Sequence, residues 1–226
     1  MSGALYIVAT PIGNLSDISF RTLDILKDVD IVYCEDTRVT RKIFNKYNIS
    51  NNLNVLNDIN ENRIKDRVID LLINGKKIAL VSDAGTPCIS DPGYRVVNLA
   101  KKSNIDVFTI PGPSSVIAAL SVSGLPTDNF FYQGFLPKKK GRQTKFNQLL
   151  HLDCSIVLFE SPKRIIRTLN DIFNYMGDRT VSLCRELTKI YEEVKVGKVS
   201  SFIKDSSLIK LKGEYVIIIA KKDYEY

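Results

Sequence analysis

The 226-residue sequence predicts an α/β protein with two domains. In the first half, short continuous apolar runs alternate with amphipathic segments, which is typical of parallel strands covered by helices on both faces. After residue 126 the predicted strands follow one another with few long helices between them, which is typical of a mixed sheet. We therefore predict an N-terminal α/β domain with a mostly parallel sheet over residues 1–115 and a C-terminal α/β domain with a mixed sheet over residues 116–226, joined near residues 112–126.

The first half contains four runs typical of buried strands, at residues 5–9, 31–34, 78–81 and 107–110. A helix is expected over residues 60–74, because its apolar residues recur on one helical face and Gly75 follows as a stop. A second helix is expected over residues 94–102, with Asp91 as its N-cap and Pro92 at its first position.

The second half contains five further predicted strands, near residues 130–135, 156–159, 181–185, 191–196 and 215–220. A basic segment at residues 137–145 follows the first of them. A helix is expected to open at Ser161 and Pro162, because proline is tolerated in the first turn of a helix.

Composition narrows the class of protein. The sequence has 32 Lys and Arg residues against 25 Asp and Glu, a formal net charge of +7. This charge favours an anionic partner, such as nucleic acid, over the alternative that the protein is basic but binds no anionic partner. The four cysteines lie far apart, which predicts neither a zinc site nor a disulfide framework and fits a reducing cytoplasm. The single histidine, His151, excludes multi-histidine metal centres and is expected to be structural, so no metal is expected. The N-terminus lacks the pattern of a signal peptide, and the apolar stretches are too short to span a bilayer, so we expect a cytoplasmic protein.

Three first-half strands end in loops of small or conformationally special residues, at residues 9–14, 82–87 and 111–115. Ligands of open α/β sheets bind outside the carboxyl ends of the strands, so three such loops favour a small-molecule pocket over simple turns. Neither a P-loop nor a G-x-G-x-x-G motif is present, which argues against a nucleotide-dependent dehydrogenase. The loops lack Lys and Arg but contain Asp83, serines and threonines. That lining suits a ligand with hydroxyls, an adenine and a positive centre better than one with phosphates.

Eight motifs, which include ATPIGN, EDTR, SDAGTP and RELTK, lie at residues 8–15, 35–38, 81–93, 111–113, 123–126, 133–137, 159–161 and 185–189. In order and spacing they resemble the ribosomal RNA small subunit methyltransferase I family, within the tetrapyrrole methylase superfamily, over nearly the whole chain. The resemblance implies a class III methyltransferase fold, with two α/β domains and the cofactor cleft between them. It further implies S-adenosylmethionine as cofactor, 2′-O-methylation of the ribose of a cytidine in the decoding region of 16S rRNA in the small ribosomal subunit, and a homodimer.

The resemblance also implies which residues bind the cofactor. In the N-terminal half and at its end these are Pro11, Asp83, Ala84, Gly85, Thr86, Ser114 and Ser115. In the C-terminal half they are Phe159, Glu160, Glu186, Leu187, Lys212, Gly213 and Glu214.

Methyl transfer to a ribose hydroxyl requires alignment, because the sulfonium is already a good leaving group, and a proton acceptor would help. Glu35 and Asp36, at the end of the second predicted strand, are candidate acceptors, and Arg38 would orient a carboxylate or a phosphate. The alternative interpretation is that these residues form a salt-bridged helix start.

The densest basic run contains Lys138, Lys139, Lys140, Arg142 and Lys145, and we expect it to contact RNA phosphates. The alternative is a solvated basic loop. Lys163, Arg164 and Arg185 lie near the second-half motifs and are expected to guide the substrate strand.

The sequence departs from the family in two respects. Asn57 and Ile59 stand where family members often carry two histidines, so no histidine there can aid catalysis. Longer members continue into a C-terminal helical extension, whereas this sequence ends at Tyr226. Two alternatives stay open, namely a methylase of the same superfamily acting on a tetrapyrrole or another small substrate, and a non-catalytic RNA-binding module. The first usually has a G-x-G-x-G-D loop, which residues 9–14 do not match.

Overall fold

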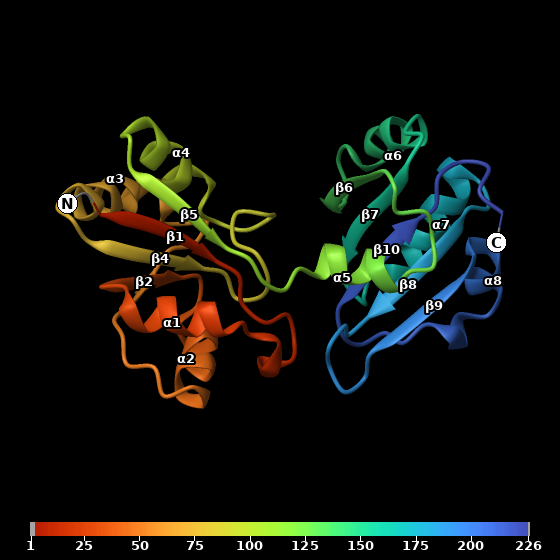
Figure 1. Cartoon of the computed structure of the whole chain (residues 1–226). Helices are drawn as coiled ribbons and strands as arrows, with labels where there is room; N and C mark the ends of the chain where they lie inside the picture. Colours follow the sequence, from red (N-terminus) through yellow and green to blue (C-terminus); the bar gives the residue numbers. More distant parts are fainter. Residues whose placement is uncertain (1–2, 226) are drawn as a thin grey trace. The chain divides into compact units, whose positions relative to one another are not determined.

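The computed structural model describes residues 3–225, and the chain divides into two compact units, Met1–Ser114 and Ser115–Tyr226 (Figure 1). Each unit is a sheet of five strands with helices packed against it. Within the described residues, no helix combines the length and the apolar character that crossing a bilayer requires.

The sheet of unit 1 is entirely parallel, with strand order β3-β2-β4-β1-β5. Its strands are β1 (Ala4–Val8), β2 (Ile31–Cys34), β3 (Leu53–Val55), β4 (Lys77–Val81) and β5 (Asp106–Ile110). The four strands predicted from apolar runs are confirmed as β1, β2, β4 and β5. The edge strand β3 was not predicted, because it spans three residues and none of them is fully buried.

Helices cover both faces of this sheet, which explains why its central strands are apolar on both sides. The helices α1 (Phe20–Asp28) and α2 (Thr37–Lys46) lie on one face, and α3 (Glu61–Ile73) and α4 (Tyr94–Lys102) lie on the other (Figure 1). Alternate residues of β4 enter the two cores, since Ile78 and Leu80 pack toward α3 and α4 while Ala79 and Val81 pack toward α1 and α2. A short 3-10 helix, η1 (Leu15–Asp17), follows β1.

The start of α4 differs from the prediction. Its N-cap is Gly93, with φ 122°, so Asp91 does not cap the helix and Pro92 lies outside it. The buried carboxylate of Glu61, at the start of α3, accepts hydrogen bonds from the backbone N–H groups of Gly93 and Arg95 at 3.1 and 2.9 Å. A side chain from the neighbouring helix therefore caps α4, and Asp91 is free for another role.

The sheet of unit 2 is mixed, with strand order β6-β7-β10-β8-β9, in which only β6 and β7 pair in parallel. Its strands are β6 (Phe130–Phe135), β7 (Ser155–Glu160), β8 (Thr180–Arg185), β9 (Glu193–Lys198) and β10 (Tyr215–Ile219). The five predicted strands are confirmed, although β9 begins two residues later than expected. The preceding loop delays it, because Glu186 and Thr188 both have positive φ there.

Three helices of unit 2 share the main core with one face of the sheet, and a fourth lies on the other face against β10 (Figure 1). The helices are α5 (Ser115–Val122), α6 (Arg142–Leu150), α7 (Ile165–Met176) and α8 (Val199–Lys204), with a 3-10 helix, η2 (Ser206–Leu208); α5 is the helix on the opposite face. The helix expected to open at Ser161 begins at Ile165 instead, because a turn occupies the preceding residues. The helix α5 was not predicted, since residues 112–126 were interpreted as a connection.

Candidate active site

The carboxyl ends of three adjacent strands carry the three loops that the sequence singled out. The chain leaves β1 through α1 toward β2, whereas it leaves the neighbouring β4 through α4 toward β5. Because α1 and α4 lie on opposite faces, the loops after β1 and β4 diverge at a topological switch point, where open α/β sheets bind their ligands. The third loop follows β5, on the other side of β1. The structure therefore brings the three predicted loops together.

Backbone contacts join these loops. Thr10 and Gly85 exchange N–H···O bonds of 2.9 and 3.0 Å, and the hydroxyl of Thr86 donates to the carbonyl of Pro113 at 3.3 Å. A Cβ added to Gly112 would lie 3.1 Å from that of Ala9, so the approach of the first and third loops requires small residues. Of the other predicted cofactor-binding residues, Pro11 is buried, Ala84 is exposed, Ser114 is half-buried at the end of unit 1, and Ser115 opens α5 of unit 2.

A cluster of carboxylates lies beside the loops, at the ends of β2 and β4. The N–H of Asp36 donates to Asp83 at 3.0 Å, and the N–H of Asp83 donates to Glu35 at 3.2 Å. Burial, together with the charges of Asp91, Asp83 and Asp58, raises the pKa of Glu35 to about 7. Burial likewise raises the pKa of Asp91 to about 6. The site thus holds carboxyl groups poised to exchange protons near neutral pH, and it suits a cationic ligand.

Asp36 and Arg38 behave differently from Glu35. The side chain of Asp36 caps α2, accepting from the N–H of Arg38 at 2.8 Å, and it also pairs with the Arg38 guanidinium. The hydrogen bond from Arg38 lowers the pKa of Asp36 to about 2. This geometry favours the interpretation of a salt-bridged helix start for these two residues and leaves Glu35 as the candidate proton acceptor. Asp91 also belongs to this group of carboxylates, since its charge acts on Glu35. The sequence analysis assigned it only to a helix start, and the D-P-G motif after β4 was the only sequence feature that could have indicated its place in the site.

The predicted cofactor-binding residues of unit 2 also gather at one end of their sheet. Tyr215, at the start of β10, lies opposite both Glu160 and Arg185, the last residues of β7 and β8. The backbone of Glu186 donates to the carbonyl of Glu214 at 3.0 Å, and the N–H of Glu214 donates to the Glu186 carboxylate at 2.9 Å. Gly213 has φ 98°, and a Cβ there would lie 2.6 Å from Cγ of Glu186. These contacts join the loop before β10, which contains Lys212, to the loop after β8, where Leu187 is buried.

Glu160 does not face a ligand through its side chain. Its carboxylate is buried and accepts from the N–H of Ser161, the hydroxyl of Thr168 and the guanidinium of Arg164, at 2.7, 2.6 and 2.7 Å. The neighbouring Phe159 is half-buried and packs edge-on against two aromatic rings of β6. Glu160 therefore supports α7 from within unit 2.

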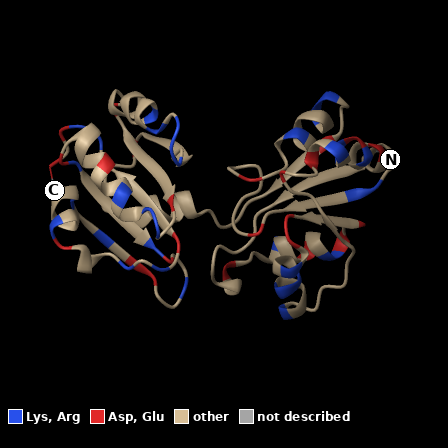
Figure 2. Ribbon diagram, turned by 180° about the vertical axis from the view of Figure 1, so that it is seen from behind, with Lys and Arg blue, Asp and Glu red and all other residues tan. Residues whose placement is uncertain are grey.

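The predicted RNA-binding residues separate into exposed and internally bonded groups. Lys138, Lys139, Lys140 and Lys163 are exposed and Lys145 is half-buried, and the basic loop between β6 and α6 is visible in Figure 2. Arg164 pairs with Glu160, while Arg185 donates to the carbonyls of Lys212 and Tyr191 at 2.7 and 3.2 Å.

The expectation that Arg142 contacts RNA is wrong. The residue is buried, and its guanidinium donates to Asp171 and Thr168, each at 2.7 Å, and to the carbonyl of Pro137 at 3.2 Å. It also packs over the ring of Phe146. These partners lie on α7 and inside unit 2, so the side chain turns inward at the start of α6.

Comparison with known proteins agrees with this architecture. A family model of the tetrapyrrole (corrin/porphyrin) methylases matches residues 4–203. The ribosomal RNA small subunit methyltransferase I of Thermotoga maritima is 43% identical over 98% of this chain and 100% of its own length, and that of Halalkalibacterium halodurans is 44% identical over 96% of this chain and 75% of its own length.

Within the described residues, no group of three or more His, Cys, Asp or Glu side chains is placed to hold a metal ion.

Solved structures share the fold at low sequence identity. A diphthine synthase superposes with a TM-score of 0.75 at 15% identity, covering 97% of this chain and 90% of its own. A uroporphyrin-III-C-methyltransferase from Thermus thermophilus superposes with a TM-score of 0.66 at 18% identity, covering 97% and 94%. The predicted class III α/β methyltransferase fold is thus confirmed. The extent and identity of the sequence matches establish that the chain belongs to the ribosomal RNA small subunit methyltransferase I family, within the tetrapyrrole methylases.

Proposed function

We propose that this protein transfers the methyl group of S-adenosylmethionine to the 2′-hydroxyl of a cytidine ribose in the decoding region of 16S rRNA. The relatives, which are named for ribosomal RNA of the small subunit, support the substrate. The structural observation that carries the proposal is the rim of unit 1, where loops without Lys or Arg meet at a switch point, with a cluster of carboxylates that includes Asp83. We further propose that the protein works in the cytoplasm as a homodimer, as the family resemblance implies.

The loops of unit 1 fit the donor chemically. They contain no Lys or Arg, and the close backbone approach at Gly85 and Gly112 leaves N–H and C=O groups, rather than bulky side chains, at the rim. Asp83 and Glu35 place carboxylates near the rim, which favours a positively charged ligand. S-adenosylmethionine supplies a methyl group on a positive sulfur that becomes a neutral thioether when the methyl group leaves. The unit 2 residues around Glu186 and Gly213 remain proposed donor contacts through the family resemblance.

Glu35 is the proposed proton acceptor. Transfer forms a bond between the ribose oxygen and the methyl carbon, and the hydroxyl proton must pass to a base. A carboxylate whose pKa is about 7 is ionised in part at neutral pH and is a much stronger base than Asp36. Proton removal of this kind contributes on the order of 10²–10⁴-fold. Alignment of the reactants contributes the remainder, on the order of 7–11 kcal/mol in favourable cases.

One incubation tests the proposal against both alternatives. The protein is mixed with donor labelled in its methyl group and with small ribosomal subunits that lack the modification, and the labelled nucleotide is mapped by mass spectrometry. We expect label on a ribose of 16S rRNA. Label on an added tetrapyrrole would support the small-substrate methylase, and RNA binding without label would support the non-catalytic module.

Donor binding is tested separately by calorimetry. Asp83→Asn and Gly85→Val should weaken donor affinity at least tenfold, because the first removes a charge beside the loops and the second places a branched side chain at φ 85°, near Ile12. The control Asp66→Asn removes a charge from the exposed face of α3 and should leave affinity unchanged. Equal affinities for all four proteins would remove these loops from the donor site.

A further inference from the structure

A pocket lies in unit 2, at the end of the sheet opposite to Glu186 and Gly213. It forms where α7 ends, β8 begins and the chain leaves β10, and its volume is about 330 Å³. Strand β8 runs from Thr180 beside this pocket to Arg185 beside the other loops, a distance of about 17 Å at the usual rise per residue. The pocket is therefore separate from the candidate donor contacts of the same unit.

The pocket contains a buried arginine whose hydrogen-bonding capacity is mostly unused. Arg179 is 7% exposed, and its Nη1 donates to the carbonyl of Ala220 at 3.4 Å. Its Nε and Nη2 are buried and have no hydrogen-bond partner among residues 3–225. Burial lowers the pKa of Arg179, but a guanidinium keeps its proton in proteins. A buried cation without partners is costly, so its retention points to a ligand that completes its bonds.

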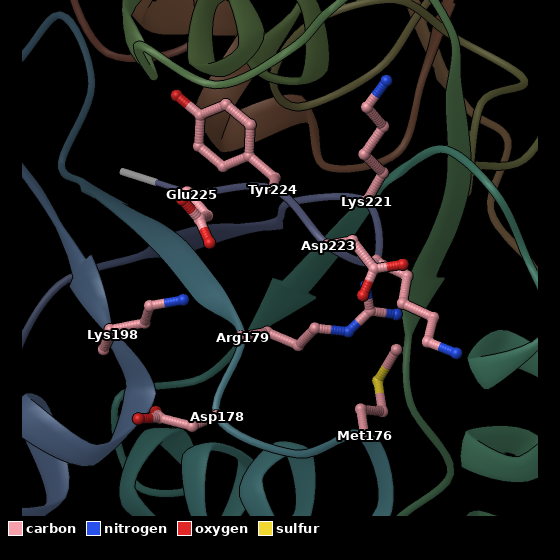
Figure 3. Close-up of a pocket in the computed structure, with 9 residues that line it drawn as sticks. Met176, Asp178, Arg179, Lys198, Lys221, Asp223, Tyr224 and Glu225 are labelled. Atoms are coloured by element: carbon pink, nitrogen blue, oxygen red, sulfur yellow. The ribbon is translucent and has the colours of Figure 1, made fainter.

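The backbone holds Arg179 in place for such a ligand. Its N–H donates to the carbonyl of Gly177 at 2.8 Å, and its own carbonyl accepts from the N–H of Val199 at 3.0 Å. Figure 3 shows the guanidinium directed toward Asp223 and the Lys198 side chain extending into the pocket from the end of β9. The cation is thus presented by a fixed segment between α7 and β8.

Four cationic and three acidic side chains line the pocket, an excess of one positive charge. Arg179, Lys198 and Lys222 are cationic, and the amine of a further lysine, Lys221, points away in Figure 3. The three acids are Asp178, Asp223 and Glu225, and the Asp178 carboxylate accepts from the N–H and the hydroxyl of Ser200 at 2.8 and 2.7 Å. Asp223 is close enough for its charge to raise the pKa of Arg179, yet the two form no ion pair within 4.0 Å in the described part of the chain.

We propose that this pocket binds a phosphate group through Arg179 and that its occupant is a backbone phosphate of the RNA substrate. The two free donors of the guanidinium match the paired oxygens of a phosphate, and the volume is at the lower end of that of small-ligand sites. The choice of RNA over free phosphate rests on the proposed function, whereas the phosphate chemistry does not.

Inorganic phosphate titrated calorimetrically into the whole protein tests the chemistry. We expect saturable binding that Arg179→Gln weakens at least tenfold. Asp223→Asn should tighten binding several-fold, because it removes the competing carboxylate. The control Lys204→Gln removes an exposed charge of α8 outside the pocket and should change nothing. Absence of binding to the unaltered protein, or equal binding by the Arg179 and control variants, would overturn the proposal.

Two further comparisons keep the proposal testable. If Arg179→Gln does not fold, Lys222→Gln, at an exposed position of the same pocket, takes its place with an expected weakening of about threefold. For RNA, a 16S fragment is titrated over a range of salt concentrations, and Arg179→Gln should reduce the slope of log affinity against log salt by about 0.7–0.9, the value for one phosphate contact. If Arg179→Gln loses phosphate binding but keeps its RNA affinity, the occupant is free phosphate and the RNA assignment is overturned. Methyl transfer by the unaltered protein is measured in parallel. Its presence would show that the proposed function holds even if the pocket assignment fails.

Discussion

The backbone N–H of Asp83 donates to the carboxylate of Glu35 at 3.2 Å, which joins the ends of two neighbouring parallel strands. This bond stabilises the ionised form of Glu35, but burial and the surrounding carboxylates act more strongly in the opposite direction. The net result is a pKa of about 7 at the rim of the candidate donor site. A structural hydrogen bond and a chemically useful pKa thus occur in the same group.

Glu35→Gln should reduce kcat by about 10²–10⁴-fold while donor affinity changes little, because glutamine keeps the acceptor oxygen for Asp83 but is not a base. For the unaltered protein, kcat/KM should rise with pH up to about 7 and level off above it, since the ionised form of Glu35 is the active one. The measurement is the pH profile of methyl transfer. Asp36→Asn serves as the control and should keep the inflection, because the pKa of Asp36 is about 2. An unchanged profile in Glu35→Gln would exclude this residue as the base.

Asp91→Asn should stabilise the protein at pH 8 and have little effect near pH 4. The folded-state pKa of Asp91, about 6, exceeds its ordinary value of 3.8, so the folded protein holds the proton more tightly and loses stability as pH rises from 3.8 through 6. Asparagine removes the charge that is penalised above this range. After discounting for the half-exposed position, a gain of about 1 kcal/mol and a rise in Tm of about 2–4 °C are expected. A Tm that falls at pH 8 but not near pH 4 would show that Asp91 is favourably placed when charged.

Gly213→Ala should cost more stability than Gly141→Ala, although both glycines have positive φ. Each substitution lowers the free energy of unfolding by about 1–2 kcal/mol, because alanine is strained in the left-handed backbone conformation. Only at Gly213 does the new Cβ meet another group, since it would lie 2.6 Å from Cγ of Glu186, whereas nothing lies within 4 Å of the same atom at Gly141. Denaturant unfolding should show an excess of about 1–2 kcal/mol for Gly213→Ala, the usual cost of overpacking. Equal losses would mean that the Glu186 loop moves aside freely.

Signals local in the sequence predicted most of the fold and the rim of the site. Continuous apolar runs identified β1, β2, β4 and β5, because both faces of these strands are covered. The loops after β1, β4 and β5 were found from their glycines, prolines and small polar residues. Their meeting at one rim follows from the strand order β4-β1-β5, which the sequence does not state but which the structure shows.

Contacts between distant residues account for what sequence reasoning missed. Arg142 lies in a basic run, and only its partners on α7, 26 and 29 residues away, turn it inward. Glu61 reads as an ordinary residue in the first turn of α3, yet it caps α4 from 32 residues away. The unpaired Nε and Nη2 donors of Arg179 likewise depend on how β8, β9 and the segment after β10 pack together.

Glu61→Ala should destabilise the protein by about 3–5 kcal/mol, whereas Arg95→Ala should cost about 1 kcal/mol, although the two residues form one ion pair at 2.7 Å. The Glu61 side chain is 1% exposed and satisfies two backbone N–H groups at the start of α4, which its loss would leave unpaired. The Arg95 side chain is 47% exposed, and Glu61 keeps both amide donors without it. Chemical denaturation of the two variants measures the difference. Similar losses for both would show that the ion pair, rather than the cap, carries the stability.

Reversing Lys138, Lys139 and Lys140 to glutamate should weaken RNA binding most at low salt. If each lysine neutralises one phosphate of a single strand, the slope of log affinity against log salt falls by about 0.7 per lysine, or about 2 in all. The control Lys101→Glu with Lys102→Glu reverses exposed charges at the end of α4 and should change the slope much less. Arg142→Gln makes a second comparison, because a buried guanidinium bonded to Asp171 and Thr168 should affect stability and leave the slope unaltered. If the α4 control changes the salt slope of RNA affinity as much as the triple reversal does, RNA binding depends on the total charge of the protein and not on this loop.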